Sequence, residues 1–155
     1  VLVGVPGATS RTEPRTVSGT IMIPAAAFVP VDSDSYWSSP DDNRLMGSGA
    51  FRAPVEFPVP SVSVRRITLY AGDGSTVMNV CAHLFRSTPA TGAFLETGFT
   101  CTVYPAPGDP QASFSTDISP RRVDTRFHGS FVLVDLYPSL SLYGVQVSYT
   151  YEAGG

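Results

Sequence analysis

The sequence contains no lysine: all ten basic residues are arginine. This absence excludes every reaction that needs a lysine amine, such as Schiff-base formation, general-base catalysis by lysine and isopeptide cross-linking. Charged residues are also scarce, at 15% of the chain, whereas Gly, Pro, Ser and Thr are abundant. This composition is typical of a β protein with many turns.

The sequence also lacks the charge and the apolar runs that nucleic-acid-binding and membrane-spanning proteins need. Its net charge is −3, which offers no basic surface to a phosphate backbone. No apolar run approaches the roughly 20 residues that cross a bilayer as a helix. We therefore expect neither a nucleic-acid partner nor a membrane span. The first residue is Val1 rather than Met, which is compatible with a removed signal peptide, and equally with a trimmed start.

The motifs of common catalytic and metal sites are absent too. His83 and His128 are the only histidines, and neither has the Cys/His spacing of a zinc site. No Gly-x-Ser-x-Gly nucleophile elbow occurs. We therefore expect a protein that is not an enzyme and that holds no cofactor and no metal. An Asp-rich segment leaves calcium as an alternative, although the spacing of its oxygen ligands is not that of an EF-hand; these ligands are Asp32, Asp34, Asp41, Asp42 and Asn43.

The strongest positive pattern is the alternation along residues 141–151. One set of alternate positions is Ser141, Tyr143, Val145, Val147, Tyr149 and Tyr151, and the other is Gly144, Gln146, Ser148, Thr150 and Glu152. A period of two is what a strand with one buried and one solvated face requires. The pattern therefore predicts an amphipathic strand and an all-β fold.

Shorter patterns of the same kind predict eight or nine strands in all and no amphipathic helix. Besides the closing strand, we expect strands at residues 16–23, 50–59, 62–70, 76–86, 97–104, 112–118, 123–128 and 129–137. The turn residues between them favour a two-sheet antiparallel β-sandwich, with jelly-roll connections as one option. We expect a flexible arm at residues 1–15 and a single sandwich domain at residues 16–155.

Four local features refine this prediction. Prolines on the outward phase place residues 50–59 at a sheet edge or a bend, because proline cannot donate to a ladder. A change of apolar phase across Arg65 and Arg66 predicts a β-bulge. Gly72-Asp-Gly74 predicts a hairpin turn. Apolar residues on both phases of residues 129–137 predict a central strand covered on both sides.

The two cysteines fit a single hairpin centred on Thr91. This register pairs Cys81 with Cys101, His83 with Phe99 and Arg86 with Glu96. A thiol pair, a ring pair and a charge pair in one register support one another. Because directly opposed antiparallel residues lie within disulfide range, we expect a bond between Cys81 and Cys101, with two buried free thiols as the alternative. A disulfide favours an oxidising compartment.

Residues 25–49 have no strong period and predict a long loop, with a short helical turn as an option. This loop carries the adjacent aromatic residues Tyr36 and Trp37. With Asp41 and Asp42 they form a candidate ligand-binding surface, since aromatic rings and carboxylates together suit a sugar ring. The alternative is that the two rings close one end of the sandwich.

The start of the chain combines a short apolar strip with a polar connector at residues 6–15. The strip consists of Val1, Leu2, Val3 and Val5. Strand addition to an exposed sheet edge is a recurring way of joining β domains. We therefore expect either that the arm is donated to a neighbouring copy or that it folds back on its own domain.

Three segments together resemble a group of secreted bacterial β-sandwich proteins. They are Ile23-Pro-Ala-Ala-Ala-Phe-Val-Pro30, the segment Val80–Arg86, and Leu142–Thr150 with its Tyr-Gly-Val sequence. The resemblance covers most of the body but not the first fifteen residues. It implies the sandwich fold, and it implies no particular activity or functional residue.

These features favour a non-enzymatic structural protomer of an extracellular filament, fibre or surface layer, whose partners are copies of itself. The alternative is a secreted carbohydrate-binding or adhesive module that binds glycans through Tyr36, Trp37 and the Asp-rich loop. A viral capsid or decoration protein is the third. The first two place the protein outside the cell or on its surface.

Overall fold

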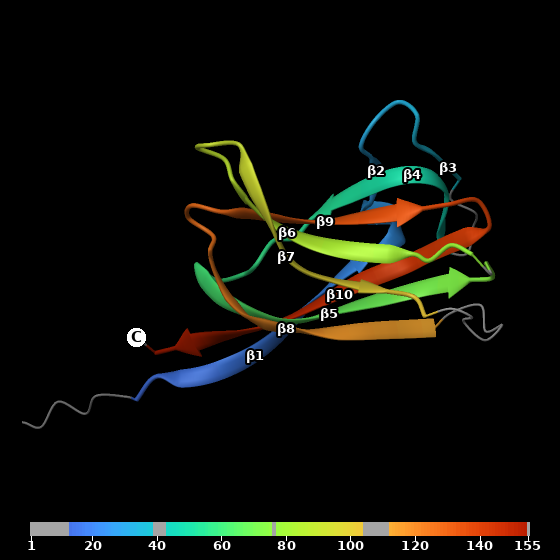
Figure 1. Ribbon diagram of the computed structural model, residues 1–155. Coiled ribbons are helices and arrows are strands. Elements are labelled where there is room, and N and C mark those ends of the chain that lie inside the picture. Colours follow the sequence, from blue (N-terminus) through green and yellow to red (C-terminus); the bar gives the residue numbers. More distant parts are fainter. Residues whose placement is uncertain (1–12, 39–42, 76, 104–111, 155) are drawn as a thin grey trace, which may run out of the picture.

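The computed structural model describes residues 13–38, 43–75, 77–103 and 112–154, and Figure 1 shows their course. Regular structure in these ranges is β, apart from one short 3₁₀ turn, η1, at Ala25–Ala27. This confirms the predicted all-β class. These ranges contain no helix that is long and apolar enough to cross a membrane.

Ten strands make up the described part of the chain. They are β1 (Arg15–Pro24), β2 (Val29–Pro30), β3 (Tyr36–Ser38), β4 (Leu45–Pro54), β5 (Ser61–Asp73), β6 (Cys81–Thr88), β7 (Ala93–Cys101), β8 (Ala112–Asp124), β9 (Gly129–Leu136) and β10 (Leu140–Ala153).

The strands form two antiparallel sheets that pack face to face (Figure 1). The first has the order β1-β10-β5-β8, and the second has the order β4-β9-β6-β7. Strand β4 belongs to both, because Leu45 and Met46 pair with β10 whereas Gly49–Pro54 pair with β9. The short strands β2 and β3 pair with the two halves of β4. The predicted antiparallel β-sandwich is therefore confirmed, with jelly-roll connections.

The hydrophobic core lies between the sheets because each long strand turns its apolar phase inward. In β4, for example, Phe51 and Ala53 are buried whereas Arg52 and Pro54 are exposed. The largest fully buried side chains are Phe51, Ile67, Leu69, Leu84, Leu136, Leu140 and Leu142, followed by valines of β5, β8 and β9 and by Val80. Burying one such side chain contributes about 1.5–3 kcal/mol, so this set holds the two sheets together.

Strand β10 confirms the predicted alternation at residues 145–151 and corrects it nearer its start. A register shift against β5 occurs between Leu142 and Gly144, which makes Tyr143 an extra residue. The phase changes at this bulge. Leu142 therefore faces the core, and Tyr143 is only half-buried instead of sharing the buried face of Val145.

Strand β5 confirms the predicted bulge and corrects the predicted turn. Its register against both β8 and β10 shifts at Arg65. Gly72-Asp-Gly74 is not a hairpin turn, because β5 continues through Asp73, whose side chain is buried. The Asp73 carboxylate accepts hydrogen bonds from the Thr102 hydroxyl and the Ser75 backbone N–H. The chain then crosses to the other sheet, where β6 pairs with β7 and β9.

The structure corrects three other expectations. Of the two options for residues 50–59, the sheet edge is wrong, since β4 pairs with β9 on one side and with β2 on the other. The bend is present, because the strand ends at Pro54 and the chain bends at residues 58–60. The hydrogen-bonded ladder between β4 and β9 ends at Pro54, so the missing N–H groups of the prolines leave no gap inside this ladder. Residues 112–128 hold one long strand, β8, followed by a turn, rather than two strands. Residues 25–49 contain the short helical turn, as η1, but they are not one long loop, because they also hold β2, β3 and the start of β4.

Strand β9 is central, as predicted, but it is not covered on both sides. Val132 and Val134 on its inner phase are fully buried. Phe131 and Leu133 on its outer phase are only half-buried. The outer surface of this sheet therefore carries apolar side chains that no other layer of the described chain covers.

The hairpin of β6 and β7 has the predicted register over its first four pairs, and the expected disulfide between Cys81 and Cys101 is present. After those pairs the register shifts by one residue. Phe85 therefore lies opposite Glu96, and the predicted pairing of Arg86 with Glu96 is wrong. A local bulge of this kind is not visible in an ideal hairpin register.

Candidate functional site: an aromatic face on one sheet

The outer surface of the β4-β9-β6-β7 sheet carries aromatic side chains with charged side chains beside them. We refer to this group as the aromatic face; it consists of Arg52, His83, Phe85, Phe94, Glu96, Phe99, Phe131 and Leu133. These residues come from all four strands of the sheet. On β4, β6 and β9 they occupy the phase opposite to the core residues, as alternation requires.

Strand register aligns these side chains in rows across the sheet. One row is Arg52, Leu133, His83 and Phe99, and the next is Pro54, Phe131, Phe85 and Glu96. A third row contains the disulfide between Cys81 and Cys101, so the row of His83 and Phe99 lies between the disulfide and the row of Phe85. Because cross-strand neighbours lie about 5 Å apart, residues far apart in the sequence form one continuous surface.

The rings of this surface contact one another in regular geometry. His83 and Phe99 stack with centroids 5.6 Å apart, and Phe85 stacks on Phe131 at 5.2 Å. His83 also stacks on Phe85, at 6.3 Å, which joins the two pairs. Phe94 meets Phe85 edge-on at 5.6 Å. Stacked and edge-on pairs of this kind are favourable, so the rings hold one another in place.

Two ionisable side chains flank the rings. The guanidinium of Arg52 lies 5.6 Å from the centre of the Phe131 ring, a cation–π contact. Glu96 Oε2 lies 2.9 Å from His83 Nδ1, which orients the imidazole. Hydrogen-bonding groups therefore stand at both margins of the ring stack.

The aromatic face is open to solvent. Phe99 is 50% exposed and Phe94 is 67% exposed. A folded protein rarely displays a contiguous apolar surface unless something binds there. Rings with donors and acceptors beside them suit a ligand that has an apolar face and a polar edge, and a pyranose ring has both.

The structure places the predicted ligand residues elsewhere, as far as it describes them. Tyr36 lies in β3 and is exposed, and Trp37 follows it with its backbone opposite Gly47. The side chain of Trp37, together with Asp41 and Asp42, lies outside the described residues. Strand β3 pairs with the first half of β4, whereas Arg52 is in the second half. The arm residues Val1, Leu2, Val3 and Val5 also lie outside the described residues.

The Asp-rich segment uses its first carboxylate for local structure. Asp32 Oδ1 accepts hydrogen bonds from the backbone N–H groups of Asp34, at 3.1 Å, and Ser35, at 3.0 Å. The Ser35 hydroxyl also donates to it, at 2.9 Å. This is an Asx turn. Within the described ranges no group of three or more His, Cys, Asp or Glu side chains is arranged to hold a metal ion.

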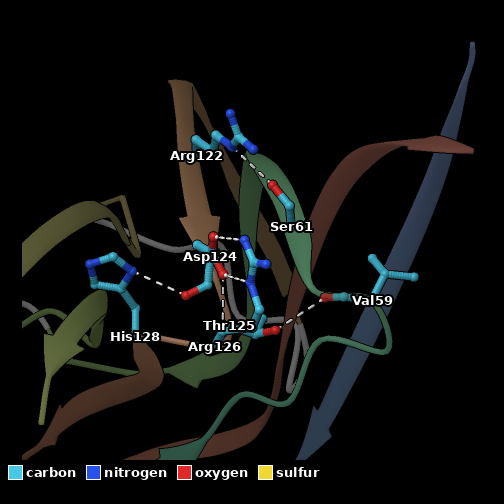
Figure 2. A network of polar contacts seen from close by, with 7 residues as sticks. All are labelled: Val59, Ser61, Arg122, Asp124, Thr125, Arg126 and His128. Atoms are coloured by element: carbon cyan, nitrogen blue, oxygen red, sulfur yellow. Dashed lines mark hydrogen bonds and ion pairs between the residues drawn. The ribbon is translucent and has the colours of Figure 1, made fainter. Parts of the chain in front are cut away.

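A polar network at the end of β8 is also structural. Figure 2 shows Arg126 holding the Asp124 carboxylate through Nε, at 2.9 Å, and Nη2, at 2.7 Å. The hydrogen bond from Arg126 is the main reason why the pKa of Asp124 falls to about 2. In Figure 2 the Asp124 carbonyl oxygen lies 3.1 Å from His128 Nδ1, and the Thr125 hydroxyl donates to the Val59 carbonyl. These contacts tie the β8–β9 turn to the segment that precedes β5.

Sequence reasoning missed most of the aromatic face. It interpreted the second apolar phase of β9 as a sign of burial, although Phe131 is half-exposed there. The useful signal was the hairpin register, which already placed His83 opposite Phe99. Phe85 follows His83 on the same phase and extends the ring pair.

Neither a protein-family model nor a curated protein matches this chain. Solved structures do match. The C-terminal CBM6 of LamC, a marine laminarinase from Zobellia galactanivorans, has 12% identity and a TM-score of 0.56, over 83% of this chain and 98% of its own. CsCBM6-3 from Clostridium stercorarium, in complex with cellobiose, has 13% identity and a TM-score of 0.46, over 88% of this chain and 94% of its own. Eiger TNF from S. frugiperda has 7% identity and a TM-score of 0.43, over 88% and 92%. The LamC match agrees with the jelly-roll β-sandwich described above.

Proposed function

We propose that this protein is a non-enzymatic, exported glycan-binding module that holds sugar rings against the aromatic face. The observation that carries the proposal is the stack of His83, Phe85, Phe99 and Phe131, open to solvent on a rigid sheet. The C–H face of a pyranose packs on such rings, and its hydroxyls meet Arg52 and Glu96 at the margins.

Preorganisation supports this function. The rings hold one another, and the disulfide lies in the row next to His83 and Phe99. A surface that is already ordered loses little side-chain entropy when it binds, so more of the contact energy appears as affinity. The disulfide also favours an oxidising compartment, in keeping with export. The LamC domain, which has this fold, is described as a carbohydrate-binding module.

The test is affinity electrophoresis against a panel of neutral polysaccharides (β-glucans, xylan, mannan and starch), followed by calorimetry with matching oligosaccharides. Phe99→Ala removes a half-exposed ring of the stack and should weaken binding about tenfold or more. Phe127→Ala is the matched control, because Phe127 is 65% exposed but lies in the β8–β9 turn. Equal binding by wild type and Phe99→Ala would contradict the proposal.

The residues suggested by the sequence are tested in the same experiment. If Tyr36 and Trp37 form the sugar site, Trp37→Ala loses binding whereas Phe99→Ala keeps it. If the aromatic face is the site, the two variants behave in the opposite way. The two surfaces are therefore distinguished by one pair of proteins.

A structural protomer that joins copies of itself is the second candidate. Strand β1 favours it, since its ten residues pair with β10 on one side and with no other strand of the described chain. An open edge of this length accepts an added strand. Electron microscopy and light scattering of the full chain beside a version lacking residues 1–12 test this candidate. Polymers that vanish with the arm support strand exchange, and monomers in both samples contradict it.

A further inference from the structure

The outer face of the other sheet differs chemically from the aromatic face. Its β5, β8 and β10 strands border a hollow of about 420 Å³, lined by Ser61, Val62, Ser63, Arg65, Arg122, Thr150, Tyr151 and Glu152. A second hollow of about 330 Å³, towards β1, shares Arg65 and Thr150 with the first. Its other lining residues include Ser18, Thr20 and Ser148. We refer to the two hollows together as the arginine groove.

The bulge in β5 creates this groove. Arg65 is the residue at which the register against β8 and β10 shifts, and it is exposed together with Arg66. An extra residue in a strand redirects its side chain and disturbs the pleat beside it. Arg65 consequently lies across β10 instead of pointing straight out from the sheet, and its Nε donates to the Thr150 hydroxyl at 3.0 Å.

Arg122 is held in the same way from the other side. Its Nε donates to the Ser61 hydroxyl at 2.9 Å, as Figure 2 shows. Each of the two guanidinium groups is therefore anchored through Nε. Their terminal Nη atoms, which form the part of the fork that binds oxyanions, have no carboxylate partner in the described part of the chain.

Two of the neighbouring arginines are already neutralised. Arg66 Nε lies 2.6 Å from Asp117 Oδ1, and Arg126 is paired with Asp124. Among the described residues, Glu152 supplies the only carboxylate that lines the groove, and it accepts a hydrogen bond from the Thr16 hydroxyl at 2.6 Å. The two arginines outweigh it, so the groove carries a local positive charge on a chain whose net charge is −3.

We propose that the arginine groove is a second binding site, which holds an anionic glycan by its carboxylate or sulfate groups. Arg65 and Arg122 bind the oxyanion through their Nη edges, and the surrounding serine and threonine hydroxyls hydrogen-bond to the sugar hydroxyls. This site does not depend on the aromatic face, because its residues belong to the β1-β10-β5-β8 sheet, and the aromatic face belongs to the other sheet, which Figure 1 shows packed against it.

The experiment uses two matched pairs of polymers in affinity electrophoresis with the full chain. Polygalacturonate is compared with its methyl ester, and dextran sulfate is compared with dextran. We expect retention by at least one polyanion, weakening with added salt, and none by its neutral counterpart. The pair that retains the protein identifies carboxylate or sulfate as the group that is bound.

The variants are chosen to separate this site from simple charge attraction. Arg65→Gln and Arg122→Gln should each weaken binding about tenfold or more, because each removes a charged hydrogen-bonding fork. Arg65→Lys keeps the charge and should restore only part of the affinity. Arg121→Gln is the control, because Arg121 precedes Arg122 in β8, does not line the groove and removes the same charge. Glu152→Gln should strengthen binding.

Several outcomes would overturn the proposal: no retention by either polyanion, equal retention of wild type and both groove variants, or equal loss in Arg121→Gln. Retention by single-stranded DNA as strong as by the polysaccharides would also contradict it, since it would show general polyanion attraction. Circular dichroism establishes that each variant is folded. Phe99→Ala should bind the polyanion as the wild type does. A failure of the arginine-groove proposal can therefore be distinguished from a failure of the aromatic-face proposal.

Discussion

Gly49 is the residue at which β4 passes from one sheet to the other. Its φ of +109° lies in the region that glycine alone adopts readily. A Cβ built there would lie 2.3 Å from Ser35 Oγ and 2.9 Å from Ser35 Cα, so a side chain has no room. The crossing of β4 thus depends on one residue.

Gly49→Ala should lower the free energy of unfolding by about 3 kcal/mol, because it combines an unfavourable φ with a steric clash. Urea unfolding followed by circular dichroism measures this change. Gly92→Ala is the control: its φ of +68° is also positive, but nothing lies within 4 Å of a new Cβ. Its expected cost is about 1 kcal/mol, from the backbone alone. Equal effects of the two changes would contradict the role of Ser35.

Asp124 predicts a pH dependence. Its hydrogen bond to Arg126 lowers the pKa of this carboxyl from 3.8 to about 2. A lowered pKa in the folded state stabilises the protein above the ordinary pKa, and this contribution is lost as the pH falls from about 4 through about 2. Carboxyl NMR titration should give the low pKa in the wild type and an ordinary one in Arg126→Gln. Thermal unfolding of Asp124→Asn should depend less on pH in this window.

At the level of elements, the hairpin of β6 and β7 supports the aromatic face. It supplies His83 and Phe85 from one strand and Phe94 and Phe99 from the other. Strand β7 pairs only with β6 among the described strands, so it is an edge strand. The disulfide joins the two strands across an adjacent row and compensates for the missing neighbour.

Replacing both cysteines, as Cys81→Ser with Cys101→Ser, should lower the free energy of unfolding by about 3 kcal/mol, as expected for a closed loop of this length, given a separation of 20 residues. Thermal unfolding measures it. A reducing agent should destabilise the wild type to a similar extent and leave the double variant unchanged. Sensitivity of the double variant to the reducing agent would contradict this explanation. Glycan binding should weaken as well, because Phe99 then lies on an untied edge strand.

At the level of the whole molecule, the sandwich separates two surfaces of different chemistry. Aromatic rings occupy the outer face of the β4-β9-β6-β7 sheet, and arginines with hydroxyls occupy the outer face of the β1-β10-β5-β8 sheet. The core between them prevents one ligand group from contacting both. If both proposals hold, one molecule links a neutral glycan to an anionic one.

This linkage is a prediction of its own. Beads carrying the neutral polysaccharide that binds best should capture soluble fluorescent dextran sulfate, or polygalacturonate, only when the protein is present. Phe99→Ala and Arg65→Gln should each abolish capture, since each removes one of the two attachments. Capture that survives in either variant would show that the surfaces do not act as two independent sites.

Local alternation was enough to identify the all-β class, the closing strand and the bulge at Arg65, because side chains of a strand alternate wherever it lies. The disulfide was equally accessible, since a hairpin brings Cys81 and Cys101 together within a short stretch of chain. Strand order was not accessible in this way. The crossing of β4 at Gly49, the buried Asp73 and the alignment of Arg52, Leu133 and His83 with Phe99 all depend on contacts between distant segments. Such contacts exist only after the two sheets have packed, because packing selects which phase of each strand is buried and leaves the other as a surface for binding.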